Sequence, residues 1–237
     1  MIGHSGPAAA PVTTGMLGPS KTGTKTAMKV DLVMPQSRFD YAAPLMQMHR
    51  DRKRVFVDTL GWKLASAYSW LEIDDFDDHR AVYLLARAIG SGDHEGSVRL
   101  LPTDGPHMLS SLFRNLCAGP LPTGDDIWEI SRLVSRPTDV AGASVVKVHR
   151  LLALALVEFA LLNSINRYTL VTEAHRVPAL LSVGWAVSPL GLPTLCLGQE
   201  LQALQIAIST TTLARMRDRL RIAHDVLQAP PSERQAA

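Results

Sequence analysis

Short apolar runs alternate with longer segments of helical periodicity, and this alternation limits the fold more than any other feature of the sequence. A run of four to eight apolar residues between turn residues is typical of a buried strand, whereas apolar residues three and four apart indicate one face of a helix. The resulting order is strand, helix, hairpin, helix, strand, helix, strand, helix. It predicts one layered α/β domain with a mixed sheet.

The predicted elements have boundaries that are good to a few residues. Pro178 is compatible with the last predicted helix only if that helix starts near Val177, which would place the proline in the first turn. The predicted helices are 41–60, 108–116, 144–163 and 174–183, and the predicted strands are 29–34, 81–88, 97–101, 127–134 and 168–172, with 201–209 as a further candidate.

The domain is expected to span 28–228, because both ends of the chain have a different composition. Residues 1–27 are rich in Gly, Pro, Ala, Ser and Thr, and cannot bury enough surface to offset the entropy of ordering. We therefore expect disorder there, or a start codon that lies later, at Met28. The polar, proline-containing segment 229–237 is expected to form a flexible tail.

Composition excludes several classes of protein. A formal net charge of +2 with interspersed acids and bases gives no reason to expect nucleic acid as a partner. Cys117 and Cys196 lie apart among apolar residues, which indicates reduced, buried thiols in a cytoplasmic protein. The histidines lack ligand-like spacing, so no metal is expected. The longest apolar stretch, 151–162, is interrupted by Glu158 and is too short for a membrane span.

Charged residues interrupt apolar segments in the middle of the chain. Arg99 lies inside a predicted strand, and Glu129 and Arg132 share another. A charge in such a place is costly unless it is paired or faces a cleft, so a buried polar network beside a pocket is the simplest explanation. The alternative is a set of solvated charges on a half-exposed sheet.

The order of these residues resembles the acyl-homoserine-lactone synthase (autoinducer synthase) family. The resemblance is strong from about residue 40 to Arg132 and weaker from there to Trp185. It rests on Arg52, Phe56 and Trp62, then Glu72-x-Asp74-x-Phe76-Asp77, then Arg99-Leu-Leu-Pro-Thr, then Trp128-Glu129-x-Ser-Arg132.

The resemblance implies a three-layer α/β/α sandwich with a mixed, twisted sheet like that of the GNAT acyltransferases. It implies an enzyme that transfers an acyl group from acyl carrier protein, or from acyl-CoA, to the amine of S-adenosylmethionine (SAM). Closure of the lactone would then release methylthioadenosine and produce a quorum-sensing signal. SAM would be a substrate, and no cofactor is expected.

The resemblance also implies roles for single residues. Glu129 is the candidate base for the SAM amine, with a purely structural ion-pair role as the alternative. Arg99 and Arg132 would orient the carboxylates of the network, because a forked guanidinium suits that task. The SAM site would be formed by Arg52, Phe56, Trp62, Asp74 and Asp77, with the aromatic rings available for stacking or cation–π contact.

The acyl chain is expected between the sheet and the helix 144–163. Leu152 and Leu156 lie four apart, hence on one helix face, and would contact the acyl chain together with Leu170; ordinary core packing is the alternative for these three. The resemblance adds Thr172, which aligns with a threonine found in some family members. A basic docking patch for acidic acyl carrier protein would consist of Lys147, Arg150 and Arg167.

One motif favours a different reading. Arg87-x-x-Gly90-x-Gly92 matches the loop with which GNAT enzymes bind the pyrophosphate of coenzyme A. That loop works by opening a helix whose N–H groups face the phosphates. Here acidic residues and a strand follow, so we interpret it as a hairpin turn. The alternatives are a GNAT-type acyltransferase that uses acyl-CoA without SAM, and a non-catalytic ligand-binding homologue.

Overall fold

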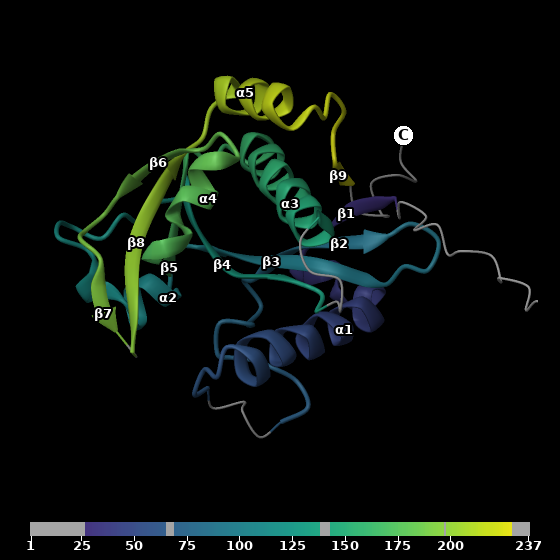
Figure 1. Cartoon of the computed structure of the whole chain (residues 1–237), viewed down its shortest axis with the longest axis horizontal. Helices are drawn as coiled ribbons and strands as arrows, with labels where there is room; N and C mark the ends of the chain where they lie inside the picture. Colours follow the sequence, from purple (N-terminus) through teal and green to yellow (C-terminus); the bar gives the residue numbers. More distant parts are fainter. Residues whose placement is uncertain (1–26, 65–68, 138–142, 197, 229–237) are drawn as a thin grey trace, which may run out of the picture.

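The computed structural model describes residues 27–64, 69–137, 143–196 and 198–228. Within them a mixed sheet lies between two layers of helices (Figure 1). Helix α1 (Ala42–Arg52) covers one face, while α3 (Ala143–Leu162) packs on the other face and carries α5 (Thr210–Leu220) on its outer side. This arrangement confirms the predicted α/β/α fold.

The sheet has the strand order β6-β8-β5-β4-β3-β2-β1-β9, and β7 pairs with β8 outside this path. Two of the pairings, β4 with β5 and β1 with β9, are parallel, and the others are antiparallel. The strands are β1 (Met28–Val33), β2 (Val82–Ala88), β3 (His94–Pro102), β4 (Ile127–Ser135), β5 (Arg167–Glu173), β6 (Ala186–Pro189), β7 (Thr194–Cys196), β8 (Gln199–Ala207) and β9 (Leu227–Gln228).

Most predicted elements are present, with some changes. The predicted helix 41–60 corresponds to α1 followed by a π-helix, η2 (Lys53–Thr59), and a 3-10 helix, η1 (Pro35–Tyr41), precedes it. The prediction for 108–116 was too long: α2 (Met108–Ser111) is a single turn, and η4 (Arg114–Leu116) follows as the chain bends to bury Leu116. The predicted start near Val177 is confirmed, because α4 (Val177–Ser182) follows the short turn η5 (Ala174–Arg176).

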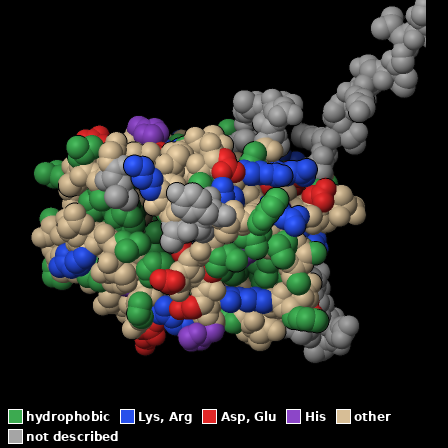
Figure 2. Space-filling view, turned by 90° about the horizontal axis from the view of Figure 1, so that it is seen from below, with side chains coloured by type: hydrophobic (Ala, Val, Ile, Leu, Met, Phe, Trp, Pro, Cys, Tyr) green, Lys and Arg blue, Asp and Glu red, His purple; other side chains and the backbone are tan. Residues whose placement is uncertain are grey.

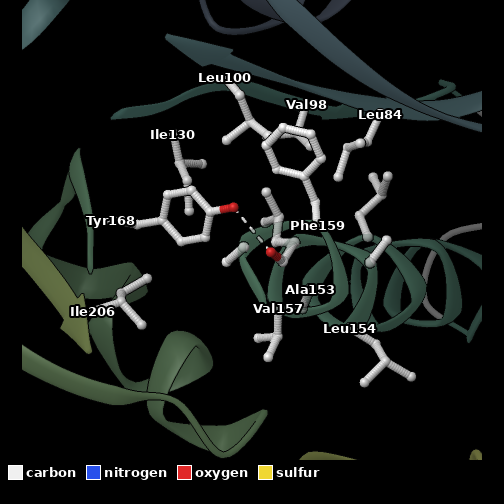
Figure 3. Close-up of a cluster of buried hydrophobic side chains, with 14 of the residues drawn as sticks. Leu84, Val98, Leu100, Ile130, Ala153, Leu154, Val157, Phe159, Tyr168 and Ile206 are labelled. Carbon is white, nitrogen blue, oxygen red and sulfur yellow. Dashed lines mark hydrogen bonds between the residues drawn. The ribbon is translucent and has the colours of Figure 1, made fainter. Parts of the chain in front are cut away.

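The main core lies between α3 and the sheet. Alternation along β2 explains how the strand serves two layers: Val82 and Leu84 face α3, while Tyr83 and Leu85 face α1. Figure 3 shows the α3 side, where the buried Tyr168 hydroxyl donates a hydrogen bond to the Leu156 carbonyl at 2.9 Å. Apolar burial on both faces of the sheet fixes the register of its central strands.

Strands β4 and β5 pair for only part of their length. The parallel pairing runs from Ile127 opposite Arg167 to Ile130 opposite Leu170. Beyond that point β4 continues along β3, and β5 continues along β8. The two strands therefore diverge after Ile130 and Leu170.

The C-terminal segment is held to α3 by a buried carboxylate. Glu158 accepts hydrogen bonds from the Val226 and Leu227 N–H groups, both at 2.9 Å, and its other oxygen accepts one from Arg217. This contact places β9 beside β1 at the edge of the sheet. Because β9 pairs with β1, it covers an edge that would otherwise present unpaired backbone groups.

Charges of both signs are interspersed on the face seen in Figure 2, from the side of α1. Among the described helices, none is long and apolar enough to cross a bilayer. Both cysteines are free thiols; Cys117 is buried and Cys196 half-buried. The expectations for 1–27 and 229–237 concern residues that, apart from Ala27, lie outside the described part of the chain.

Candidate active site

Six charged side chains meet on the α1 face of the sheet, next to the point where β4 and β5 diverge. They are Arg52 at the end of α1, Glu72, Asp74 and Asp77 from the segment before β2, Arg99 on β3 and Arg132 on β4. This ion cluster contains three arginines and three carboxylates, so its formal charges cancel. Such balance is what buried charges require, because an unpaired one is strongly destabilising.

Arg52 is fully buried, with 0% of its side chain exposed. Its Nε donates to Glu72 Oε2 at 2.5 Å, and its two terminal nitrogens donate to the two oxygens of Asp77 at 2.8 and 2.9 Å. The fork of the guanidinium thus ties α1 to two points of the segment before β2.

Arg99 and Arg132 share Asp74. Arg99 donates to Asp74 Oδ1 at 2.5 Å and lies 3.0 Å from Asp77, whereas Arg132 donates to Asp74 Oδ2 at 2.6 Å. Arg132 also donates to Glu72 Oε1 at 3.1 Å. Each carboxylate of the ion cluster therefore bridges two arginines, and the cluster is one connected unit.

A β-bulge in β4 places Arg132 in the ion cluster. Between the pairs Ser97–Val134 and Arg99–Ser131, β4 has one residue more than β3. Arg132 adopts a left-handed backbone with φ 52° at this point. Regular alternation would place it on the α3 face; the bulge instead keeps it on the side where Ser131 accepts a hydrogen bond from Arg99, at 3.0 Å.

The arginines around Asp77 keep its carboxyl group ionised. Burial alone would raise its pKa, but the hydrogen bonds and charge of Arg52, with the charge of Arg99, hold the pKa of Asp77 well below its usual range. The Tyr83 hydroxyl also donates to Asp77, at 2.8 Å. Burial next to this carboxylate raises the pKa of Tyr83, which therefore stays protonated.

Glu129 lies on the same face of β4 but outside the ion cluster. Its Oε2 accepts a hydrogen bond from the Leu109 N–H group at 2.9 Å, and 1% of the residue is exposed. Within the described residues it forms no ion pair. Burial raises the pKa of Glu129 to about 7, against the lowering effects of the Leu109 N–H group and of the charges of Arg99 and Arg132. A carboxyl with such a pKa exchanges a proton near neutral pH.

The Met108 thioether lies between two arginines of the ion cluster. Its sulfur is 3.3 Å from a terminal nitrogen of Arg99 and 3.4 Å from one of Arg132. A thioether is a weak acceptor, so these two N–H groups are available to a stronger one. Both point to the α2 turn, whose Leu109 N–H group binds Glu129.

Aromatic rings pack against two arginines of the ion cluster. Phe56 stacks on Trp62 with ring centroids 4.8 Å apart and an interplanar angle of 18°. The Arg132 guanidinium lies 5.6 Å from the Phe56 centroid, and that of Arg99 lies 5.8 Å from the Phe76 centroid. These are cation–π distances, and the rings limit the access of water to the charges.

A family model for autoinducer synthases matches residues 37–215. The chain belongs to the autoinducer synthase family. Among curated relatives, the isovaleryl-homoserine lactone synthase of Bradyrhizobium diazoefficiens is 32% identical over 196 residues, which cover 82% of this chain and 87% of the relative. An acyl-homoserine-lactone synthase of Ralstonia solanacearum is also 32% identical, over 70% of this chain and 82% of its own length. The chain is an acyltransferase of this class.

Solved structures agree with this assignment. The CoA-dependent acyl-homoserine lactone synthase BjaI, with SAM and isopentyl-CoA, is 29% identical with a TM-score of 0.78, and the match covers 86% of this chain and 94% of that one. The synthase LasI is 26% identical with a TM-score of 0.70, over 82% and 95% of the two chains. A protein assigned as an N-acetyltransferase from Lactobacillus plantarum, at 17% identity and a TM-score of 0.53, shares the fold alone.

The synthase brings the predicted catalytic and SAM-site residues into one region. The residues concerned are Arg52, Phe56, Trp62, Asp74, Asp77, Arg99, Glu129 and Arg132. The charges of the ion cluster are paired, its three arginines are buried, and Glu129 is buried beside them, which contradicts the alternative of a solvated sheet face. Their catalytic roles remain predictions.

The predicted acyl residues lie on the opposite face of the sheet. Leu152, Leu156 and Leu170 are fully packed members of the main core. Thr172 follows Leu170 on the same face of β5, beyond the point where β4 leaves this strand. An acyl chain that reached these residues from Glu129 would therefore pass between the diverging strands.

The predicted docking patch is not one surface. Lys147 and Arg150 lie near the start of α3, whereas Arg167 lies at the start of β5, after α3 has crossed the sheet. The Arg167 N–H group donates to the Asp126 carbonyl at that far end. Because α3 runs antiparallel to β5, these residues belong to opposite ends of the fold.

The Arg87–Gly92 motif forms the β2–β3 hairpin, as predicted. Ala88 N–H donates to the Asp93 carbonyl across the turn, and the Arg87 side chain binds the buried Asp31 at 2.6 Å. No helix starts after this turn within the described residues, so it lacks the N–H groups that a pyrophosphate would need.

Sequence reasoning missed several residues that contact the site. Glu72 was seen in the motif but not assigned to the SAM site, although it bridges Arg52 and Arg132. Tyr83 and Met108 were not assigned to the site either, although Gly105-Pro106-x-Met108-Leu109 fits the family pattern; in a strand or turn such side chains are usually interpreted as core residues. Among the described residues, no group of His, Cys, Asp and Glu is arranged to hold a metal ion.

Proposed function

We propose that this synthase uses Glu129 as the base and the ion cluster as the frame that holds SAM, with an acyl-CoA thioester as donor. The observation that carries the proposal is the position of Glu129: a buried carboxyl with a pKa of about 7 lies beside arginines whose charges are already matched. SAM acts as a substrate in this scheme, and no cofactor takes part.

The first step forms the amide. Glu129 accepts a proton from the SAM ammonium group, directly or through one water, which frees the nitrogen lone pair. The nitrogen attacks the thioester carbonyl, the amide C–N bond forms, and the C–S bond breaks. The nitrogen loses its second proton to the leaving thiolate, which departs as free coenzyme A. The Leu109 N–H group holds Glu129 in place for this transfer.

The second step closes the ring. A carboxylate oxygen of the acylated SAM attacks the carbon bonded to the sulfonium, and the C–S bond breaks with its electron pair returning to sulfur. Neutral methylthioadenosine leaves, so the protein has mainly to align the carboxylate with that carbon. The Arg99 and Arg132 N–H groups that now face Met108 sulfur are suited to bind the carboxylate.

Likeness to CoA-dependent enzymes supports acyl-CoA as the donor. BjaI, which matches well over most of both chains, is CoA-dependent, and so is the synthase MesI, at 27% identity and a TM-score of 0.74. Acyl carrier protein is the alternative donor. The place of action that we propose is the cytoplasm, which suits the free thiols Cys117 and Cys196.

Release of methylthioadenosine tests the proposal. The full chain is incubated with SAM and either isovaleryl-CoA or the same acyl group on acyl carrier protein, and the lactone is identified by mass spectrometry. We expect turnover with acyl-CoA, and a rate about a hundredfold or more lower for Glu129→Gln. Turnover with the carrier protein alone would exclude CoA as donor, and near-normal turnover of the variant would remove Glu129 from the base role.

A further inference from the structure

The segment that joins α1 to Trp62 has an unusual winding. It is the π-helix η2, seven residues from Lys53 to Thr59. π-Helices are rare, mostly limited to single turns inside α-helices, and frequent at functional sites. The segment carries Phe56, whose ring covers Arg132 of the ion cluster.

Contacts between residues five apart match this winding. Lys53 Nζ lies 2.5 Å from Asp58 Oδ1, and the Thr59 hydroxyl donates to the Arg54 carbonyl at 2.8 Å. In an α-helix, residues five apart lie about 140° apart around the axis, so these side chains would not meet. The ion pair between Lys53 and Asp58 therefore stabilises the π winding and not the α winding.

The winding determines where Phe56 lies. Phe56 is in the middle of η2 and is 6% exposed, because its ring is between Trp62 and Arg132. The Trp62 N–H group also donates to the Phe56 carbonyl, at 2.9 Å. A return to α winding would rotate Phe56 around the helix axis and remove its ring from Arg132.

We propose that Lys53 and Asp58 are positioning residues of the SAM site, which act by selecting the π winding of η2 and so holding the Phe56–Trp62 stack over Arg132. This inference rests on the proposed function of that site. Neither side chain forms an ion pair with the ion cluster among the described residues. Lys53 is 15% exposed and Asp58 53% exposed, so the pair is partly screened and its effect moderate.

Steady-state kinetics of three variants and one control test this proposal. Lys53→Met and Asp58→Asn each remove one charge, and the double variant Lys53→Asp with Asp58→Lys restores the pair in reverse. We expect each single variant to raise KM for SAM by about threefold to fivefold. The kcat value and KM for the acyl donor should stay within about twofold, and the reversed pair should return KM for SAM close to that of the wild type.

The matched control is Arg54→Met. Arg54 lies next to Lys53, is 62% exposed, and pairs with Asp51 at 3.3 Å with the ordinary spacing of three residues. Loss of this neighbouring pair should leave all three kinetic constants unchanged. An equal rise in KM for the control, or a reversed pair that stays defective, would contradict selection of the winding by Lys53 and Asp58.

The position of the Phe56–Trp62 stack can also be measured without an activity assay, by fluorine NMR. The chain has four tryptophans, so fluorotryptophan labelling gives few fluorine resonances, and Trp62→Phe identifies that of Trp62. The ring of Phe56 should shift this resonance in the wild type, and both single variants should move it toward the position of free fluorotryptophan. An unmoved resonance would overturn the inference, whereas a wild-type chain with no SAM-dependent turnover would instead count against the proposed function.

Discussion

The Leu109 N–H group donates a hydrogen bond to Glu129 Oε2 at 2.9 Å, and so a single helical turn fixes the carboxyl that we assign as the base. Neighbouring Met108 on the same turn contacts Arg99 and Arg132 through its sulfur. The α2 turn therefore links the proton acceptor to the ion cluster. Movement of this turn would change the position of the base and of the arginines together.

The pH dependence of turnover follows from the pKa of Glu129, which burial raises to about 7. A base works only when deprotonated, so kcat/KM should rise with pH through about 7 and then level off. The SAM amine ionises in the same pH range, so the wild type has to be compared with a variant that lacks the carboxyl. The pH profile of kcat/KM is measured from pH 5.5 to 9 for the wild type and for Glu129→Gln. The profile of the variant should show one ionisation fewer than that of the wild type, and identical profiles would show that neither ionisation belongs to Glu129.

The same carboxyl should destabilise the fold at high pH. Its pKa in the folded state, about 7, lies above the ordinary value of 4.5, so the folded state loses stability as pH rises from 4.5 to 7. With about 1.4 kcal/mol for each pKa unit, this loss amounts to about 3 kcal/mol above pH 7. Urea unfolding of Glu129→Gln should therefore show a gain of about 2–3 kcal/mol at pH 8 and little change at pH 4.5. Equal stabilities at pH 8 would show that the ionised carboxylate is not strained by burial.

Non-additivity should reveal the connected ion cluster. Asp77→Asn and Arg99→Gln each remove one charge and leave a partner unmatched, at a cost of about 3–5 kcal/mol in function or folding. The two side chains lie 3.0 Å apart, so the double variant should lose much less than the sum of the singles. Methylthioadenosine release and thermal unfolding are measured on all three. Small, additive losses would mean that the two charges act independently.

Loss of the Glu158 carboxylate should release the C-terminal segment. Glu158→Ala leaves the Val226 and Leu227 N–H groups without their acceptor, and hydrogen bonds to a charged group contribute about 1.5–3 kcal/mol each. We expect a loss of about 2–4 kcal/mol in unfolding, with faster amide exchange along β1 and β9. Glu200→Ala, at an exposed position of β8, is the control and should change neither. A fully protected β1 in Glu158→Ala would show that β9 holds without the carboxylate.

Sequence periodicity predicted the central elements, because burial on both faces of the sheet requires apolar residues in a recognisable pattern. The nearly continuous apolar run of β2 and the long apolar helix α3 fit only a sheet that is covered on both faces. The strand β9 could not be predicted, since two residues carry no period, and its position depends on Glu158 about seventy positions earlier. Arg167 was misplaced for a related reason: spacing along the chain does not show which end of a crossover helix a residue occupies.

Within the site, charges inside apolar strands predicted Arg99, Glu129 and Arg132, because their burial needs partners. The bulge at Arg132 and the π winding of η2 left no trace in the pattern. The bulge depends on tertiary contacts, because Arg132 binds Glu72 and Asp74. The π winding depends on local pairs at a spacing of five, which a search for periods of 3.6 and 2 does not detect.

The left-handed backbone of Arg132 sets two selective pressures against each other. Glycine would adopt this conformation at no cost, whereas a residue with a Cβ atom gives up about 1–2 kcal/mol there. Glycine would also remove one of the two guanidinium partners of both Glu72 and Asp74. A library selected for signal output should therefore retain arginine at this codon, while a library in which the acidic partners are neutralised and heat resistance alone is selected should drift to glycine. The residue found at position 132 should therefore show whether a sequence has been selected for catalysis or only for folding.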